Sequence, residues 1–272
     1  MITGKGSDVG EKLSSDPRID MVSFTGSTKV GKEIQHHAAE TIKKVALELG
    51  GKSPAILLDG GDVDLAVKRV MNSCFYNSGQ TCSAFTRFFV PAHLEQEVID
   101  KIKESISHYQ TGDPEKEDTK LGPLVSKGRY DSVKEYIESG IEEGAELVLG
   151  EIPQAEKGFF VEPCVFTRVT SDMKIAKEEI FGPVLSLFTY DDLDEVIEEA
   201  NATPYGLSGA VFGKKKEAIA LAEKIETGNV HINENTSVFQ APFGGYKQSG
   251  IGRESGLHGL LEFTEIKAVF TG

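Results

Sequence analysis

The chain has 272 residues, of which 39% are hydrophobic and 26% are charged, and its formal net charge is −14. This length is enough for one large domain or two modest ones with a substantial buried core. The acidic balance argues against a nucleic-acid-binding face, which would have to be basic, and the sequence contains no apolar run long enough for a membrane helix.

Hydrophobic periodicity predicts strands that alternate with helices along most of the chain. In the first half the predicted order is strand 21–26, helix 27–40, strands 43–50 and 54–59, helix 62–79, strand 86–91 and helix 93–109. In the second half it is helix 126–143, strand 145–149, extended stretch 159–170, strand 184–190, helix 192–201, strand 207–212, helix 214–226 and strand 229–233. A glycine-rich loop, a further helix and a last strand at 263–270, FTEIKAVF, follow. This alternation favours an α/β fold with a largely parallel sheet.

The first motif with chemical content is FTGSTKVG at 24–31, a predicted strand, a glycine turn and a helix start. Free backbone N–H groups at a helix start make a good anion site, and the hydroxyl groups of Ser27 and Thr28 add donors. A helix cap that binds no ligand is the alternative. Gly26 and Ser27 are therefore candidate anion-binding residues.

The motif LELGGKSP at 47–54 places Glu48 before a double glycine at the end of a predicted strand. Functional sites of α/β sheets gather at strand ends, and a carboxylate there can act as a general base. A surface glutamate is the alternative. The GKS run inside this motif is not a P-loop, because the first glycine of that pattern would fall on Ala46.

The segment NSGQTCSAFTR at 77–87 puts Cys82 in a small polar loop between a predicted helix and a predicted strand. A thiol has a pKa near 8.5, so a catalytic cysteine needs nearby donors or positive charge to form its thiolate. The small neighbours Ser83 and Ala84 leave room for a substrate, while a buried structural thiol is the alternative. Cys74, by contrast, falls on the apolar face of a predicted helix and is expected in the core.

Two later motifs are compatible with ligand contacts. In KEEIFGPV (177–184), the carboxylate of Glu179 could grip vicinal sugar hydroxyls and the aromatic ring of Phe181 could pack on a flat ring; a salt bridge and a core phenylalanine are the alternative. The glycine-rich run APFGGYKQSGIGRESG (241–256) demands positive φ angles or close backbone approach, and Phe243 could line a pocket mouth.

The spacing of cysteines and histidines indicates neither a disulfide framework nor a zinc site. The sequence holds three cysteines and six histidines, and no metal is expected. The first residues lack the apolar core of a signal peptide. These features favour a reducing, cytoplasmic location.

In this order, the motifs FTGST, ELGGKSP, GQTCSA, EEIFGPV and PFGGYKQSGIGRE resemble the NAD(P)-dependent aldehyde dehydrogenase family. The resemblance covers nearly the whole chain. It implies an α/β fold in which a three-layer parallel-sheet catalytic domain is joined to a partial Rossmann-like cofactor domain. The expected division is a partial dinucleotide-binding domain at 1–50, a catalytic domain at 51–250, and a helix and strand at 251–272 that return to the cofactor and oligomerisation region.

The resemblance also implies roles for particular residues. Cys82 would be the nucleophile that attacks a small-molecule aldehyde, and Glu48 the general base that hydrolyses the resulting thioester. NAD or NADP would be the cofactor. The implied cofactor-binding residues are Gly26, Ser27, Leu49, Gly50, Glu179 and Phe181. The implied substrate-binding residues are Thr81, Ser83 and Phe243.

The resemblance further implies that family members carry more residues before the position of Met1, including most of the cofactor sheet and an asparagine of the oxyanion hole. We therefore expect the isolated chain to bind NAD weakly and to oxidise aldehydes poorly. The homo-oligomer expected of the family is in doubt for this chain on the same ground. Two alternatives stay open: a non-catalytic fragment that docks through the strand 263–270, and a thiol esterase that uses Cys82 and Glu48 without hydride transfer.

Overall fold

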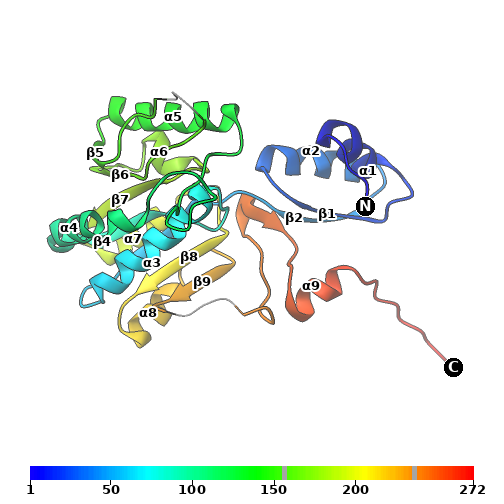
Figure 1. Ribbon diagram of the computed structural model, residues 1–272. Coiled ribbons are helices and arrows are strands. Elements are labelled where there is room, and N and C mark those ends of the chain that lie inside the picture. The colour runs from blue at the N-terminus through cyan, green and yellow to red at the C-terminus, as the bar shows by residue number, and fades with distance from the viewer. Residues whose placement is uncertain (155–157, 235–237) are drawn as a thin grey trace.

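A computed structural model, which describes residues 1–154, 158–234 and 238–272, contains two β-sheets (Figure 1). The larger sheet has the strand order β5-β6-β7-β4-β3-β8-β9, and the smaller has the order β1-β2-β10. The strands are β1 (Met21–Thr25), β2 (Lys44–Glu48), β3 (Ser53–Leu57), β4 (Phe85–Pro91), β5 (Glu146–Leu149), β6 (Cys164–Thr167), β7 (Val184–Tyr190), β8 (Ser208–Phe212), β9 (Asn229–Ile232) and β10 (Gly250–Ile251). The α-helices are α1 (Glu11–Ser15), α2 (Thr28–Ala39), α3 (Val63–Phe75), α4 (Glu95–Ser105), α5 (Lys127–Glu142), α6 (Lys174–Lys177), α7 (Leu193–Asn201), α8 (Lys215–Ala222) and α9 (Gly256–Glu262).

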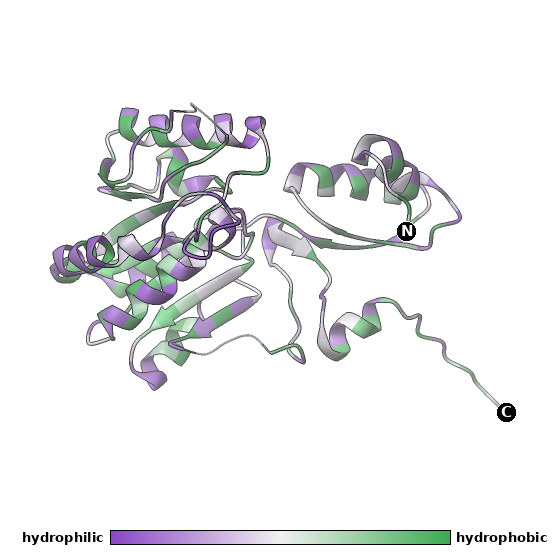
Figure 2. Cartoon of the chain, viewed as in Figure 1, coloured by the Kyte–Doolittle hydropathy of each residue, from purple (hydrophilic) through white to green (hydrophobic). Residues whose placement is uncertain are grey.

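The larger sheet is the middle layer of a three-layer arrangement. Its strands pair in parallel except β5, which is antiparallel to β6. Successive side chains of a strand point to opposite faces. On β4, Phe88 and Val90 accordingly join an apolar cluster with side chains of α3 and α4, whereas Phe89 joins the cluster that includes α5, α7 and α8. The central strands are the most hydrophobic part of the molecule (Figure 2), and the predicted parallel α/β architecture is confirmed.

The smaller sheet lies beside the larger one and carries α1 and α2 (Figure 1). β1 and β2 are parallel, and the short strand β10 pairs with β2 in the antiparallel sense. α2 starts at Thr28 because the side chain of Ser27 accepts a hydrogen bond from the backbone N–H of Val30. The chain passes from β2 to β3 through only four residues, 49–52, so the carboxyl end of β2 is held close to the larger sheet.

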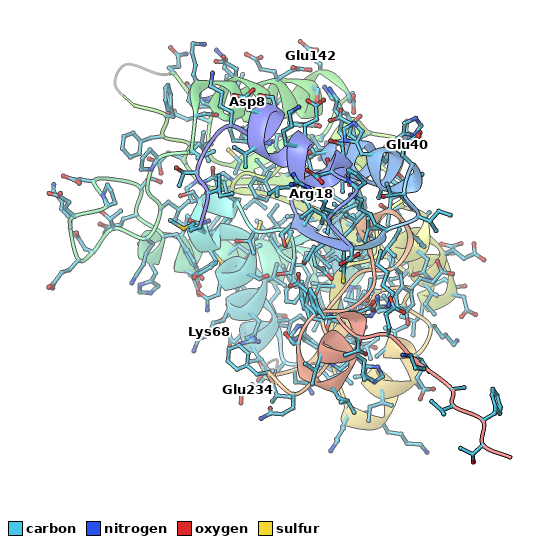
Figure 3. The ribbon with its side chains drawn as sticks, turned by 90° about the vertical axis from the view of Figure 1, so that its right-hand side faces the viewer. Asp8, Arg18, Glu40, Lys68, Glu142 and Glu234 are labelled. Carbon is cyan, nitrogen blue, oxygen red and sulfur yellow. The ribbon has the colours of Figure 1, made fainter. Side chains whose placement is uncertain are left out.

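The acidic surplus of the sequence lies on the surface. The side chains of Asp8, Glu40, Glu142 and Glu234 project outward from separate elements (Figure 3). Such spread charge solvates the molecule. No helix among the described residues is long and apolar enough to cross a membrane.

Two sequence-based predictions need correction. The helix predicted over 62–79 ends at Phe75, because Asn77 and Ser78 adopt positive φ angles of 50° and 56° that a right-handed helix cannot hold. The prediction of a last strand over 263–270 is wrong, because this segment pairs with no strand of the described chain. A strand needs a hydrogen-bonding neighbour, and apolar residues such as Phe270, 94% exposed, do not supply one.

Candidate active site

A cavity of about 450 Å³ lies between the carboxyl ends of β1 and β2, the loop before β4 and the segment after α6. Parallel strands bring their carboxyl ends to the same edge, where ligand sites form. The residues that line it are Thr25, Gly26, Ser27, Glu48, Leu49, Gly50, Gln80, Thr81, Cys82, Arg129, Glu179 and Phe181. Residues separated by up to 156 positions in the sequence thus share one site.

Cys82 is the only partly exposed cysteine of the three, since Cys74 and Cys164 are buried. Burial is the main cause that raises the pKa of the Cys82 thiol, and the carboxylate of Glu179 adds to it. The backbone N–H groups of Ser83 and of Cys82 itself lower that pKa in part. The thiol is therefore mostly protonated when the site holds no further positive charge, and a base or a cationic ligand would increase its thiolate fraction.

Glu48 ends β2, and its side chain is buried, with 3% exposure. Its Oε2 atom has no hydrogen-bond partner among the described residues. Burial, together with repulsion from Glu254, raises the pKa of Glu48 to about 8, although the guanidinium of Arg253 opposes the shift. A carboxyl group with a pKa in this range can both take up and release a proton near neutral pH, as a general base must.

Glu179 is anchored on the other side of the cavity. Its Oε1 atom accepts a hydrogen bond of 3.0 Å from the backbone N–H of Gly51. Burial raises the pKa of Glu179, and this hydrogen bond lowers it in part. Phe181 lies two residues later and has a positive φ of 55°. Its ring faces the first turn of α5, where the guanidinium of Arg129 lies 5.3 Å from the ring centroid.

The glycines of the site fit the dinucleotide that the family resemblance implies. A Cβ atom added to Gly50 would lie 2.3 Å from Oε2 of Glu179, and one added to Gly26 would lie 2.4 Å from the ring of Phe24. Only glycine therefore keeps the backbone and the carboxylate this close. The backbone N–H donors at the start of α2 suit a phosphate. The carboxylate of Glu179 suits the hydroxyl groups of a ribose, and the ring of Phe181 suits a flat heterocycle.

The structure brings together most, but not all, of the residues that the sequence suggested. Nine of the eleven candidates line the cavity, and the exceptions are Ser83 and Phe243. Ser83 lines a second cavity of about 370 Å³ that shares Thr81 with the first. Phe243 lies near the base instead: its backbone exchanges two hydrogen bonds with Glu254, of 2.8 and 2.7 Å, and its neighbour Gly244 adjoins Oε1 of Glu48.

Three residues that line the cavity were missed by the sequence analysis: Thr25, Gln80 and Arg129. The first two lie inside motifs that were recognised, FTGST and GQTCSA, but no role was assigned to them there. Arg129 lies in the ordinary helix start SKGRYDS, far from every motif, and carried no local signal.

Lys52 follows the cavity residue Gly50 by two positions, and its burial leads to a prediction about the stability of the protein. Its side chain is 2% exposed, and its Nζ atom has no hydrogen-bond partner among the described residues. Burial, followed by repulsion from Arg87, lowers the pKa of Lys52 to about 7. Between that value and the ordinary 10.5, the unfolded state binds the proton more strongly than the folded state, so stability rises with pH in this window.

We expect Lys52→Met to be more stable than the unsubstituted protein by about 1–3 kcal/mol at pH 7, because it removes a buried unpaired charge. Well above pH 10.5 the advantage should vanish, since Lys52 is then neutral in both states. Urea denaturation across this pH range measures the difference. An equal loss of stability at every pH would show instead that the aliphatic packing of Lys52 dominates.

The whole length of the chain is similar to known proteins. A family model described as "Aldehyde dehydrogenase family" matches residues 1–269. A putative aldehyde dehydrogenase of Staphylococcus saprophyticus is 48% identical over 273 aligned residues, and one of Staphylococcus haemolyticus is 47% identical. Each match covers 99% of this chain and 58% of the relative. The chain thus spans little more than half the length of the curated relatives it matches.

Solved structures give the same result. Aldehyde dehydrogenase C of Pseudomonas syringae, in complex with NAD+ and octanal, superposes with a TM-score of 0.95 at 44% identity, over 98% of this chain and 56% of that one. The NAD+ complex of an aldehyde dehydrogenase from Bacillus cereus superposes with a TM-score of 0.94 at 45% identity, over 98% and 55% of the two chains.

Proposed function

The chain belongs to the aldehyde dehydrogenase family, and from this membership we propose that the protein containing it oxidises an aldehyde to a carboxylic acid with NAD or NADP. The observation that carries the proposal is that Cys82 and Glu48, a nucleophile and a base of raised pKa, line one cavity with Glu179 and Phe181. The aldehyde is a small molecule.

The cofactor would be held by residues on two sides of this cavity. Gly26 and Ser27, at the start of α2, would border the pyrophosphate. Glu179 would accept hydrogen bonds from ribose hydroxyl groups, and Phe181 would pack beside the nicotinamide, with Leu49 and Gly50 completing the wall. When bound, the dinucleotide supplies the hydride acceptor. The proposal is supported by relatives whose structures contain NAD+.

Cys82 performs the first half of the reaction. Its thiolate adds to the carbonyl carbon, so that a C–S bond forms and the carbonyl oxygen becomes an alkoxide. Backbone N–H groups of the Cys82 loop are suited to stabilise this oxyanion. After the carbon has lost its hydride, the C=O bond re-forms and the acyl group remains on Sγ as a thioester. A thiol suits both stages, because it is a strong nucleophile and a good leaving group.

Glu48 performs the second half. Its carboxylate takes a proton from a water molecule as the water oxygen attacks the thioester carbon. The C–S bond breaks, the thiolate of Cys82 is released, and the product is the carboxylic acid. Thr81, Ser83 and Phe243 are proposed to contact the substrate, since the first two flank Cys82 and the third lies near Glu48 through Gly244.

The direct test is to incubate the purified full-length protein with NAD or NADP and octanal, and to follow the reduced dinucleotide and octanoic acid together. We expect the two products in equal amounts. Hydrolysis of an activated ester that needs no dinucleotide, with no oxidation of octanal by a folded protein, would contradict the proposal and favour an esterase.

A further inference from the structure

Ser249 lies in the glycine-rich loop, and the proposed reaction gives its side chain no role. The residue is 0% exposed, and its Oγ atom makes two hydrogen bonds. It accepts one of 2.8 Å from the backbone N–H of Gly206 and donates one of 2.7 Å to the backbone carbonyl of Gly50. The carbonyl of Ser249 also accepts a hydrogen bond of 2.8 Å from the N–H of Leu49. Leu49 and Gly50 line the cavity, so Ser249 is bonded to the backbone of the cavity wall.

The peptide group that joins Gly50 to Gly51 is held at both of its polar atoms. A trans peptide group is planar, and its C=O and N–H point in opposite directions. The carbonyl of this group accepts the hydrogen bond from Ser249, and its N–H donates the hydrogen bond of 3.0 Å to Oε1 of Glu179. Rotation of the one plane would break both hydrogen bonds together. The orientation of the Glu179 carboxylate therefore depends on the hydroxyl group of Ser249.

The backbone at this peptide group has little rigidity of its own. A Cβ atom on Gly50 would lie 2.3 Å from Oε2 of Glu179, and one on Gly51 would lie 2.4 Å from the carbonyl oxygen of Cys82. The close packing thus requires glycine on both sides of the peptide group, and glycine restricts the backbone least. Hydrogen bonds must hold the plane instead. Since both glycines are buried, a carbonyl that lost its donor would also be costly.

We propose that Ser249 is a positioning residue: it fixes the plane of the Gly50–Gly51 peptide group, and this peptide group holds the carboxylate of Glu179 in the orientation that receives a ribose. The part that concerns the ribose rests on the proposed function, whereas the part that concerns the peptide group does not. The competing explanation is that the hydroxyl of Ser249 only stabilises the fold. In that case its loss should affect the site no more than the loss of another buried hydroxyl.

The test compares Ser249→Ala with a matched control, Ser14→Ala. Ser14 is 1% exposed, and its Oγ atom also makes two hydrogen bonds, each of 3.0 Å, to the carbonyl of Glu11 and with Nδ1 of His37. It belongs to α1 and is not among the described residues that line the cavity. Each substitution removes one buried hydroxyl with two partners. Urea denaturation of both variants measures the loss of stability that they share.

The first measurement is hydrogen–deuterium exchange of the peptide that contains Gly51, which needs no ligand. In Ser249→Ala the amide of Gly51 should exchange at least about tenfold faster than in the unsubstituted protein, because it leaves Glu179 whenever the peptide plane rotates. Ser14→Ala should change this rate by no more than about twofold. Equal rates in the two variants would overturn the proposal.

The second measurement is the Kd for NADH by fluorescence titration of the full-length protein. Ser249→Ala should raise this Kd by about 5- to 30-fold, and Ser14→Ala should leave it within about twofold. Because Ser249 is proposed to act through Glu179, adding Ser249→Ala to Glu179→Ala should raise the Kd by no more than a further factor of about two. Effects that multiply in the double variant would overturn the proposal.

Ser249→Cys keeps a weak donor at the same position, so its effects on exchange and on the Kd should lie between those of serine and alanine. If Ser249→Ala does not fold, both measurements are made with Ser249→Cys, and wild-type values for both would overturn the proposal. If the unsubstituted protein does not bind NADH, the proposed function fails, and the exchange of the Gly51 amide still decides whether Ser249 fixes the peptide group.

Discussion

Cys82→Ala is expected to lower the rate of aldehyde oxidation by at least about 10⁴-fold, because it removes the thiol that we propose forms the covalent intermediate. The other two thiols cannot replace it. Cys74 and Cys164 are buried in the core, and burial raises the pKa of each to about 12, so neither forms an appreciable thiolate at neutral pH. Steady-state assays with octanal measure the loss.

The matched control is Cys74→Ala, which removes a buried thiol of the same size from α3. It should retain the activity and lose only stability, by about 1 kcal/mol. The Kd for NADH should be nearly unchanged in Cys82→Ala, since a methyl group fits wherever the thiol does. Retention of more than a tenth of the activity in Cys82→Ala would refute the assignment of the nucleophile.

Labelling with iodoacetamide gives a readout that does not depend on turnover. In the folded protein only Cys82 should react, because it is the partly exposed thiol. Its raised pKa means that the labelling rate should climb as the pH rises. A rate that is independent of pH would show that the thiolate is already formed at neutral pH.

The second large effect is expected from Glu48→Gln, which keeps the shape of the side chain but removes the base. Steady-state turnover should fall by about 10²- to 10⁴-fold. Formation of the thioester does not need this base to activate water, so one equivalent of reduced dinucleotide per site should still appear as a rapid burst. Rapid-mixing kinetics separate the burst from the slow phase. An equal loss of the burst and of the slow phase would assign Glu48 to the first half of the reaction as well.

The raised pKa of Glu48 fixes the pH dependence of the slow phase. Because the carboxylate is the active form and its pKa is about 8, hydrolysis should slow about tenfold for each pH unit below 8. Glu254→Gln removes a negative neighbour that raises this pKa. The variant should therefore shift the pH profile of hydrolysis to lower pH, and an unshifted profile would show that Glu254 does not act on Glu48.

Much of the fold could be predicted because its signals are local. Strands β3, β4 and β7 are short apolar runs that are buried on both faces, and helices such as α2 and α3 begin at Ser or Asp caps that the sequence displays. The prediction of a strand over 263–270 failed because a strand depends on a signal that is not local. Its composition suits a strand, but a strand is defined by the neighbour to which it bonds, and composition does not contain the neighbour.

The residues of the candidate site also divide into those that local sequence signals indicated and those that only the folded structure brings to the site. Glu48, Cys82 and Glu179 became candidates because each lies in a motif where glycines mark a turn, and the family resemblance then gave them their expected roles. Arg129 reaches the site only because the first turn of α5 packs beside Ile180 and Phe181, a contact across about fifty residues that no local pattern encodes. Ser83 was assigned to the substrate side by the family resemblance, and its position in a second cavity next to Thr81 could not be deduced from spacing within the loop.

The most direct test of the central claim is to look for the acyl group on Cys82. Glu48→Gln protein, mixed with NAD and octanal and quenched in acid during the burst, would be analysed by mass spectrometry of the intact protein and of its peptides. We expect an octanoyl adduct on the peptide that contains Cys82, formed only when the oxidised dinucleotide is present. Reduced dinucleotide accumulating without an adduct on Cys82, or with the adduct on another residue, would contradict the account.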